Sequence, residues 1–419
     1  MMVGGRGMAR GRGRGFKLPV ATVLLLAAVT GCTSATPEHG VSLAGAPEAT
    51  PTATTPAPVP EPTVKLAGAK AASYTKSVRI AVKQGTLSSV KVSTKKGGDE
   101  LAGAVSADGL TWVSEDPPKP ALAYRAVAEV KDSTGKASTK KLKFTAASVP
   151  DSKRVGFTVT PSNGAIVGIG QPVIVRFMTP ITRRAAMEKV MELSARTPGG
   201  NSVSGSWSWL NSREVHWKPN KFWTPGTKVS LAMHIAGVKA ATNRYGRTDY
   251  SQTFKIGASH ITRVDAATHR IKVYRDGKLV ANWPTGTGKS GLETYSGTYV
   301  VLGKAAVQQM DSCSAGITCD KKDPDYYDDP EYFATRITAS GTFLHAADWD
   351  GLLGQANVSH GCIHLSKINA EKFYDHAVPG DIVIVSNTGR GPQDRINTQD
   401  PGLYDWNLPT STWKANSAL

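Results

Sequence analysis

Short runs of alternating apolar and polar residues, separated by glycine, proline and aspartate, extend over most of this 419-residue chain. Alternation with a period of two is typical of strands that bury one face. Residues 123–145 hold two such runs around Asp132–Gly135, and residues 261–288 hold two more around Asp276-Gly277. Aspartate-glycine pairs form tight turns between antiparallel strands. With 42 glycines and 25 prolines available for turns, the chain is predicted to be mostly β.

The first 32 residues predict an export signal. Five basic residues and no acidic one precede an apolar run from Leu18 to Val29. A helix of these 12 residues would be about 18 Å long, too short for the ~30 Å hydrocarbon core of a membrane. A basic segment before a short apolar run is typical of a secretory signal peptide. A Gly/Arg tract that binds nucleic acid is the alternative interpretation of residues 1–17.

The end of the apolar run, Val-Thr-Gly-Cys at residues 29–32, resembles a bacterial lipobox. In a lipobox the cysteine receives a diacylglycerol and becomes the new N-terminus, so Cys32 is the expected lipidation site. Ordinary cleavage nearby, with a free Cys32, is the alternative. We therefore expect an exported protein that is lipid-anchored to the outer face of the cytoplasmic membrane.

Residues 33–62 consist largely of threonine, alanine and proline, and they are predicted to be a linker. A linker of this length spans roughly 30 Å as a flexible coil and up to roughly 90 Å when extended. Such a tether would carry the folded domains away from the membrane and into the cell wall.

Two regions of short strands follow, residues 63–148 and residues 149–257. Their lengths and the spacing of their turns fit two immunoglobulin-like β-sandwiches. One amphipathic helix is expected in the second region, over Thr182–Ser194, with its two methionines and Val190 facing inward. Neither region contains a cluster of potential ligands, so we expect both to act as spacers and wall-contacting modules.

Both sandwich regions are strongly basic. Residues 63–257 carry a net charge of +18, from 30 basic and 12 acidic residues, whereas residues 258–388 carry −3. Export excludes nucleic acid as a partner, so anionic wall polymers or phospholipid headgroups are the expected partners of this charge. Because charges are screened over about 8 Å, these regions would attract an anionic partner only when it is in close contact.

Three histidines and one cysteine fall within 20 residues: His345, His360, Cys362 and His364. Three interpretations are open. The last three of these residues could bind zinc, although no spacing typical of zinc sites accompanies them. A buried cysteine with surface histidines is the second interpretation. A cysteine nucleophile with a histidine base fits best, because Gly361 lets a substrate carbonyl approach and leaves backbone amides for an oxyanion hole.

Residues 359–362, Ser-His-Gly-Cys, are followed by an apolar residue, and a histidine lies upstream in Phe-Leu-His-Ala-Ala-Asp-Trp. Together they resemble the signature of the L,D-transpeptidases with a YkuD-type catalytic domain. The likeness covers residues 259–387, and it implies a YkuD-type β-sandwich catalytic domain over residues 258–388 with a C-terminal extension over residues 389–419. The tandem sandwiches and the tryptophan-containing tail are similar to those of actinobacterial wall-bound members.

The resemblance implies catalytic roles for four side chains or backbone positions. Cys362 would be the nucleophile and His345 its proton acceptor and donor, with the carbonyl of Ala346 orienting the imidazole. His360 and Gly361 would shape the site, and the amides near Gly361 and Cys362 would form the oxyanion hole. Lowering a thiol pKa from ~8.5 to ~6 gains only about two-fold in rate once the loss of nucleophilicity is included. We therefore expect His345 to act mainly as a proton carrier.

The resemblance also implies substrate contacts. Ser340 and Gly341 correspond to substrate-contacting positions on the strand before His345. Tyr327 lies where the family has a tyrosine of the active-site lid that faces the acyl group. His364, two residues after the cysteine, departs from the asparagine or arginine that is frequent at this position, where polar groups of the substrate are held.

The reaction of the resembling family is the cross-linking of peptidoglycan stem peptides. Cys362 would attack the third residue of a donor tetrapeptide at its L-centre and release the terminal D-Ala, and an amine of an acceptor stem would then close a 3→3 bridge. The broken peptide bond supplies the energy, so no cofactor and no metal are expected. Carbapenems are expected covalent inhibitors. Hydrolysis by an L,D-carboxypeptidase and a non-catalytic wall-binding lipoprotein are the alternatives.

Cys313 and Cys319 lie in the segment where the resembling family has its active-site lid. An oxidising compartment favours a disulfide between them, which would stiffen the lid, and two free thiols are the alternative. The segment is also rich in acidic residues. We expect these acidic residues to attract the cationic acceptor amine, and a merely solvated loop is the alternative. The acidic residues are Asp320, Asp323, Asp325, Asp328, Asp329 and Glu331.

Overall fold

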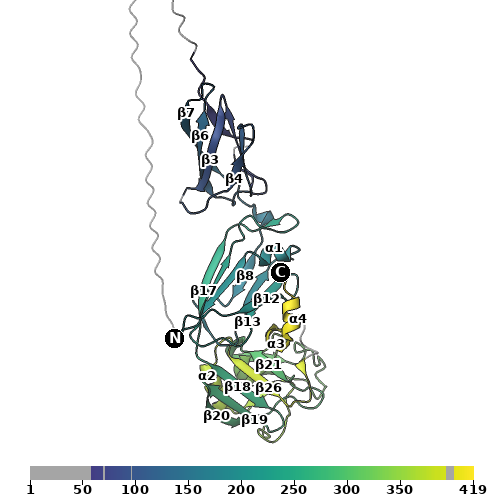
Figure 1. Cartoon of the computed structure of the whole chain (residues 1–419). Coiled ribbons are helices and arrows are strands. Elements are labelled where there is room, and N and C mark those ends of the chain that lie inside the picture. The colour runs from purple at the N-terminus through teal and green to yellow at the C-terminus, as the bar shows by residue number, and fades with distance from the viewer. Residues whose placement is uncertain (1–57, 69–70, 96, 393–400) are drawn as a thin grey trace, which may run out of the picture. The chain divides into compact units, whose positions relative to one another are not determined.

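The computed structural model describes residues 58–68, 71–95, 97–392 and 401–419 (Figure 1). The predicted signal peptide, Cys32 and most of the predicted linker lie outside these residues. The described chain is mostly β, as predicted, and its strands fall into three successive regions. No helix of the described chain is both long enough and apolar enough to cross a membrane.

The first region is a sandwich of two antiparallel sheets, ordered β1-β2-β5-β4 and β3-β6-β7. The predicted turn at Asp132–Gly135 lies between β6 and β7. Trp112, Tyr124 and Val130 are among the side chains buried in its core. The strands are β1 (Thr63–Leu66), β2 (Arg79–Lys83), β3 (Thr86–Thr94), β4 (Gly103–Val105), β5 (Thr111–Ser114), β6 (Ala123–Lys131) and β7 (Ala137–Thr145).

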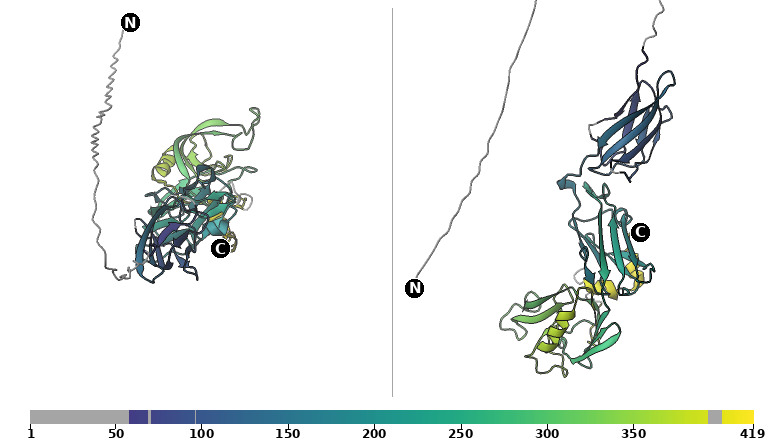
Figure 2. Two further views of the ribbon diagram at one scale, coloured as in Figure 1. Left: turned by 90° about the horizontal axis from the view of Figure 1, so that it is seen from above. Right: turned by 90° about the vertical axis from the view of Figure 1, so that its left-hand side faces the viewer.

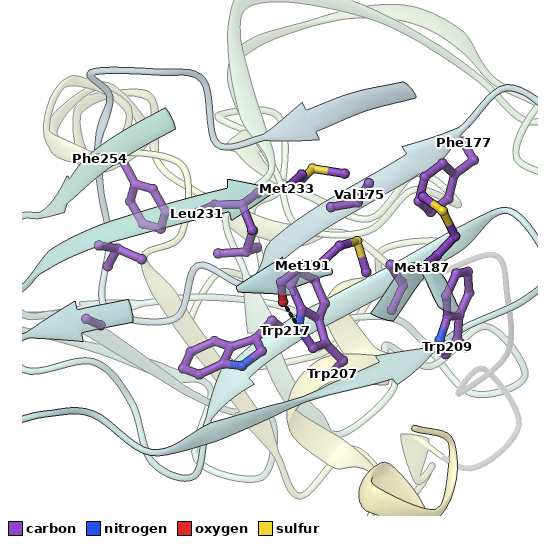
Figure 3. Packing of buried hydrophobic residues seen from close by; sticks show 14 of the residues in the cluster. Val175, Phe177, Met187, Met191, Trp207, Trp209, Trp217, Leu231, Met233 and Phe254 are labelled. Atoms are coloured by element: carbon purple, nitrogen blue, oxygen red, sulfur yellow. Dashed lines mark hydrogen bonds between the residues drawn. The ribbon is translucent and has the colours of Figure 1, made fainter. Parts of the chain in front are cut away.

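The second region is a sandwich with sheets ordered β12-β13-β10-β8 and β11-β14-β17-β9, together with a small sheet of β15 and β16. Large apolar side chains fill its core, including Trp207, Trp217, Leu231 and Phe254 (Figure 3). Its elements are the short helix η1 (Asp151–Lys153), β8 (Phe157–Thr160), β9 (Ile166–Val167), β10 (Val173–Phe177), α1 (Arg184–Glu188), β11 (Met191–Arg196), β12 (Gly205–Trp209), β13 (Glu214–Pro219), β14 (Lys228–Met233), β15 (Lys239–Ala241), β16 (Arg244–Tyr245) and β17 (Tyr250–Ile256).

The helix predicted over Thr182–Ser194 is wrong in its second half. Helix α1 ends at Glu188, and strand β11 begins at Met191. Every residue of β11 pairs with a residue of β14, so this segment makes ladder hydrogen bonds to a neighbouring strand in place of those within a helix. Met187 and Met191 are buried in the core, as expected (Figure 3). Apolar spacing therefore identified the inward positions, while pairing with β14 decided the conformation.

The third region has a five-stranded sheet ordered β20-β19-β18-β26-β21, a four-stranded sheet ordered β22-β23-β24-β25, and one helix, α2. Tyr299, Leu344 and Ile363 belong to its core. At the predicted hairpin turn, Asp276 and Gly277 both have positive φ, 46° and 79°. The elements are β18 (His260–Asp265), β19 (Arg270–Arg275), β20 (Lys278–Pro284), β21 (Gly297–Val300), β22 (Gly303–Asp311), β23 (Asp328–Arg336), β24 (Phe343–Ala346), β25 (Ile363–Leu365), α2 (Lys367–His376) and β26 (Ile382–Ser386).

The strand predicted to carry Ser340 and Gly341 is two strands separated by a turn. β23 ends at Arg336, and β24 begins at Phe343. Gly341 lies in the turn with a φ of 109°, a conformation that residues with a side chain rarely adopt. The guanidinium of Arg336 donates hydrogen bonds of 2.9 and 2.7 Å to two carbonyl oxygens of the turn. Ser340 and Gly341 therefore belong to a loop that side-chain hydrogen bonds hold in place.

Two short helices form the described end of the C-terminal extension and contact two regions (Figure 2, yellow). Asn407 in α3 accepts from the amide of Thr298 and donates to its carbonyl oxygen, each at 2.8 Å, and Thr298 lies on β21. Trp413 in α4 donates from its indole nitrogen to the carbonyl oxygen of Ser206 on β12, at 3.2 Å. The extension therefore ties the second sandwich to the third region. The helices are α3 (Pro401–Asn407) and α4 (Thr410–Ala415).

A buried charge cluster holds α3 against β13. His216 has no exposed surface, and its Nδ1 lies 2.6 Å from a carboxylate oxygen of Asp405. Its Nε2 lies 2.9 Å from Glu214, which also accepts two hydrogen bonds from Arg176. Burial disfavours a charged ring, but the two carboxylates outweigh burial and raise the pKa of His216 to about 9.

We predict that Asp405→Asn lowers the melting temperature at pH 6.5. Removing one partner of a buried ion pair costs about 3–5 kcal/mol. Because the pKa of His216 is raised from 6.5 to about 9, the stabilisation by its charge is complete below about pH 6.5 and is lost as the pH rises through about 9. The melting temperature of the wild type should therefore fall over this interval, and that of the variant should fall less.

Thermal denaturation followed by circular dichroism at several pH values between about 6 and 9.5 measures both effects. Asp375→Asn, on the exposed side of α2, is the matched control and should keep the wild-type curve. Equal pH slopes for the wild type and Asp405→Asn contradict the prediction.

Candidate active site

Parallel pairing of β24 with β25 places two histidines side by side. His345 on β24 and His364 on β25 are direct partners in the ladder. Their ring centroids are 5.0 Å apart in an edge-to-face arrangement, and each residue is only 3% exposed. Cys362 comes one residue before β25 begins, and it lines the same cavity as the two rings.

Cys362 is a free, partly exposed thiol at the end of a tight turn. Its Sγ lies 3.8 Å from the carbonyl oxygen of Gly341. The hydroxyl of Ser359 donates to the carbonyl oxygen of Cys362 at 2.6 Å and accepts from the amide of Gly361 at 3.1 Å. Gly361 has a φ of 121°, which glycine tolerates best. The amide of Gly361, expected to serve an oxyanion hole, is therefore engaged with Ser359 in this structure.

The Nδ1 atom of His345 has two oxygen partners. The carbonyl oxygen of Ala346 and Oε2 of Glu331 each lie 3.0 Å away, and Glu331 is on β23. Burial disfavours charge on the ring, but the interactions with the side chains of Cys362 and Glu331 outweigh burial and raise the pKa of His345 to about 10. His345 is therefore an imidazolium at neutral pH, placed beside the thiol.

The ring of His364, in contrast, is uncharged. Its Nδ1 lies 2.8 Å from Oδ2 of Asp350, whose Oδ1 accepts from the amide of Leu352 at 2.9 Å. Burial and the charge of His345 lower the pKa of His364 to about 4, despite the attraction of Asp350. A neutral ring that donates its Nδ1 proton to a carboxylate carries its lone pair on Nε2. His364 is thus an uncharged hydrogen-bond acceptor beside a charged imidazole.

His360 and Tyr327 also line the cavity that contains the thiol. His360 Nε2 is 3.1 Å from Oδ1 of Asp325, and the same oxygen also binds Lys289. The ring of Tyr327 lies 5.1 Å from that of His360. Burial, followed by the charge of Cys362, raises the pKa of Tyr327 to about 12, so its hydroxyl stays protonated.

Cys313 and Cys319 form a disulfide in the loop between β22 and β23. The backbone amide of Ser312 donates to the carbonyl oxygen of Tyr327 at 3.0 Å, which joins the two ends of this loop. Residues 315–318, inside the bridged loop, line a cavity that reaches Cys362. The bridged loop therefore borders the site.

Two cavities meet at Cys362, and Tyr327 and His360 line both. We name the first the histidine cavity; it has a volume of about 600 Å³, and its walls include His345, His364, Trp349, Tyr332, Glu331 and Lys367. We name the second the turn cavity; it has a volume of about 410 Å³, and its walls include Ser340, Gly341, Gly361, Tyr295 and Arg390.

The structure brings all eight sequence-predicted site residues together around these cavities: Cys362, His345, His360, Gly361, Tyr327, Ser340, Gly341 and His364. Three further residues were missed in their roles. Glu331 had been grouped with the lid acids, but it lies on β23 and contacts His345. Asp350 and Trp349 follow β24 closely in sequence, and their nearness to His345 in the chain could have identified them as site residues. Glu331 could be found only from the register of β23 with β24.

The zinc interpretation of His360, Cys362 and His364 finds no support in the geometry. The two histidines bond to different carboxylates, those of Asp325 and Asp350. Across the described ranges, no group of three or more His, Cys, Asp or Glu side chains is arranged to hold a metal ion.

Comparisons with known proteins match two parts of this chain to families. Residues 69–239 match the bacterial Ig domain family, and residues 259–385 match the L,D-transpeptidase catalytic domain family. L,D-transpeptidase 2 of Mycobacterium tuberculosis is 35% identical over 355 residues, which cover 84% of this chain and 83% of the relative. L,D-transpeptidase 5 of the same species is 31% identical over 334 residues, which cover 78% of this chain and 70% of the relative.

One similar solved structure is L,D-transpeptidase 3 from Mycobacterium tuberculosis in complex with a faropenem-derived adduct. It is 34% identical, with a TM-score of 0.46, and the match covers 56% of this chain and 98% of that chain.

We predict that Glu331→Gln slows the alkylation of Cys362 by iodoacetamide at pH 7. The Glu331 carboxylate helps to keep His345 charged, and a cation beside Cys362 stabilises negative charge on the attacking sulfur. Because a thiolate that is easier to form is also a weaker nucleophile, the rate should fall by only about two-fold. Mass spectrometry of the alkylated peptide gives the rate, with Glu371→Gln on the exposed side of α2 as the control. An unchanged rate in Glu331→Gln contradicts this role.

Proposed function

This chain belongs to the L,D-transpeptidase family, and we propose that it forms 3→3 cross-links between peptidoglycan stem peptides through a thioester on Cys362. The observation that carries the proposal is the meeting of two cavities at one thiol beside a charged imidazole. A transferase of this kind needs room for an acyl donor and for an amine acceptor at a single nucleophile. Volumes of about 410 and 600 Å³ lie within the range of small-ligand sites.

The first step in this proposal is acylation of the enzyme. The Cys362 thiolate attacks the carbonyl carbon of the third stem residue at its L-centre. As the peptide bond breaks, the nitrogen of the terminal D-Ala takes the proton of His345. The products are a thioester on Cys362 and free D-Ala, and His345 is left neutral. Its partners Glu331 and Ala346 hold the ring in position throughout.

The position of His345 assigns the two cavities. The leaving nitrogen must lie within hydrogen-bond reach of this ring, which lines the histidine cavity. We therefore assign the histidine cavity to the departing D-Ala and to the acceptor amine that replaces it. The acyl part of the donor then occupies the turn cavity, next to Ser340 and Gly341.

Carbapenems are proposed covalent inhibitors of this enzyme. Their strained lactam carbonyl offers the Cys362 thiolate an acyl carbon, and the lactam nitrogen takes the place of the leaving D-Ala nitrogen. Relief of the ring strain then supplies part of the driving force for acylation. The resulting thioester lacks a good acceptor.

The proposed setting is the outer face of the cytoplasmic membrane, with the enzyme reaching into the wall. Support comes from the export-like residues 1–32 and the linker composition of residues 33–62. The net charge of +18 over residues 63–257, from 30 basic and 12 acidic residues, suits contact with anionic wall polymers or phospholipid headgroups.

Cys362→Ser should abolish both acylation and cross-linking. A hydroxyl has a far higher pKa than a thiol, so the serine cannot supply the attacking anion that the cysteine supplies. The wild type should gain the mass of one carbapenem on the peptide that contains Cys362. Incubated with tetrapeptide stems, it should release D-Ala and produce a dimer with a new 3→3 bond.

Intact-protein and product mass spectrometry measure all of these outcomes. Ser314→Ala, in the bridged loop, is a control that leaves the thiol in place. A Cys362→Ser protein that still forms dimers contradicts the nucleophile assignment. A wild type that releases only tripeptides is an L,D-carboxypeptidase.

A further inference from the structure

The site contains a second imidazole, that of His364, which has no role in the acylation step. His364 lies 5.0 Å, centroid to centroid, from His345 and lines the histidine cavity. Asp350 binds its Nδ1 at 2.8 Å, so the lone pair of the neutral ring is on Nε2. The indole of Trp349 packs edge-to-face against the ring, 4.9 Å from centroid to centroid. A buried carboxylate and an aromatic wall therefore hold a neutral imidazole in one orientation.

The cross-linking step requires the removal of two protons from the acceptor nitrogen. An amine of ordinary pKa near 10.4 is unprotonated in only about 1 of 2,500 molecules at pH 7. The acceptor thus arrives as an ammonium group with three protons and no lone pair, and the amide product keeps one proton. His345, neutral after acylation, can hold one of the two protons that leave. The other passes to water or to a second side chain that lies within reach.

We propose that His364 is the base that takes the second proton from the acceptor nitrogen, and that Asp350 positions it. This inference rests on the proposed transpeptidation. Neutral His345 takes the first proton from the ammonium group and becomes an imidazolium, and the freed amine attacks the thioester carbonyl. The second proton passes from the nitrogen to the Nε2 lone pair of His364, the carbon–sulfur bond breaks to release the Cys362 thiolate, and His364 returns its proton to water.

The low basicity of His364 suits this second proton. Burial and the charge of His345 lower the pKa of His364 to about 4. A nitrogen that has bonded to the thioester carbonyl carbon is a far stronger acid than the free ammonium group, so a weak base can accept its proton. Once the amide has formed, the charge of His345 disfavours a proton on His364 and helps to release it to water.

The surroundings of His364 also suit the binding of a cationic acceptor group. Two carboxylates face the site from different elements, Glu331 on β23 and Asp350 in the loop after β24. Trp349 and Tyr332 are 65% and 48% exposed, so their rings are accessible to an ammonium group at the histidine cavity. Hydrolysis makes no such demand, because water has a lone pair before any proton leaves. His364 should therefore matter for the amine acceptor more than for water.

The test compares acceptors in His364→Asn, which keeps a polar side chain but removes the basic nitrogen. The enzyme is first loaded with a tetrapeptide donor or a carbapenem, and the thioester is quantified by mass spectrometry. A stem-peptide acceptor or hydroxylamine, which is unprotonated at pH 7, is then added. A positioned base contributes about 100-fold or more. The ratio of dimer to hydrolysed tripeptide should therefore fall about 100-fold in the variant, while hydroxylamine should release the acyl group within a few-fold of the wild-type rate.

Asp350→Asn should show the same selective defect to a smaller extent, because His364 remains but is no longer held in one tautomer. His234→Asn, an exposed histidine of the second sandwich, is the matched control. Thioester formation with the carbapenem shows that each variant is folded. A wild-type dimer ratio in His364→Asn overturns the inference, and so does an equal loss with both acceptors, which indicates a role in cavity shape. If the wild type itself forms thioester but no dimer, the proposed transpeptidation fails, and this inference fails with it.

Discussion

The alignment of two parallel strands is the constraint on which this active site depends. Residues 347–362 separate β24 from β25, and the register of the two strands sets His345 opposite His364. A shift of one strand by one residue would place the two rings on opposite faces of the sheet. The turn that carries Gly361 then delivers Cys362 to the start of β25. Three functional side chains thus follow from one pairing, which the core residues on either side bury.

One of the two adjacent imidazoles is charged and the other is neutral, because their partners differ. His345 has Glu331 and the thiol beside it, and both favour the protonated ring. His364 has only Asp350 as a partner and must bear the repulsion of its charged neighbour as well as burial. Neighbouring groups that titrate apart in this way can divide the roles of acid and base between them. The carboxylates therefore determine what each ring can do.

Local patterns in the sequence predicted much of this molecule, and they failed where distant segments decide. Alternation located the strands, and Asp276-Gly277 located a hairpin, because both depend on neighbours in the chain. Residues 359–362 pointed to Cys362 as the proposed nucleophile, because the turn before it is local. The predicted helix over Thr182–Ser194 failed, since β14 pairs with its second half. Glu331 was missed for the same reason: its contact with His345 exists only once β23 and β24 are side by side.

The pair between His216 and Asp405 has a consequence for the order in which the chain can mature. These residues are 189 positions apart, so the sandwich that contains His216 is synthesised long before its partner. At about 5–20 residues per second, the interval is roughly 10–40 s. During that time His216 lacks the carboxylate of Asp405, and Glu214 is its carboxylate partner. Completion of this buried cluster therefore waits for the synthesis of α3, and a chain that stops before Asp405 leaves β13 without that partner.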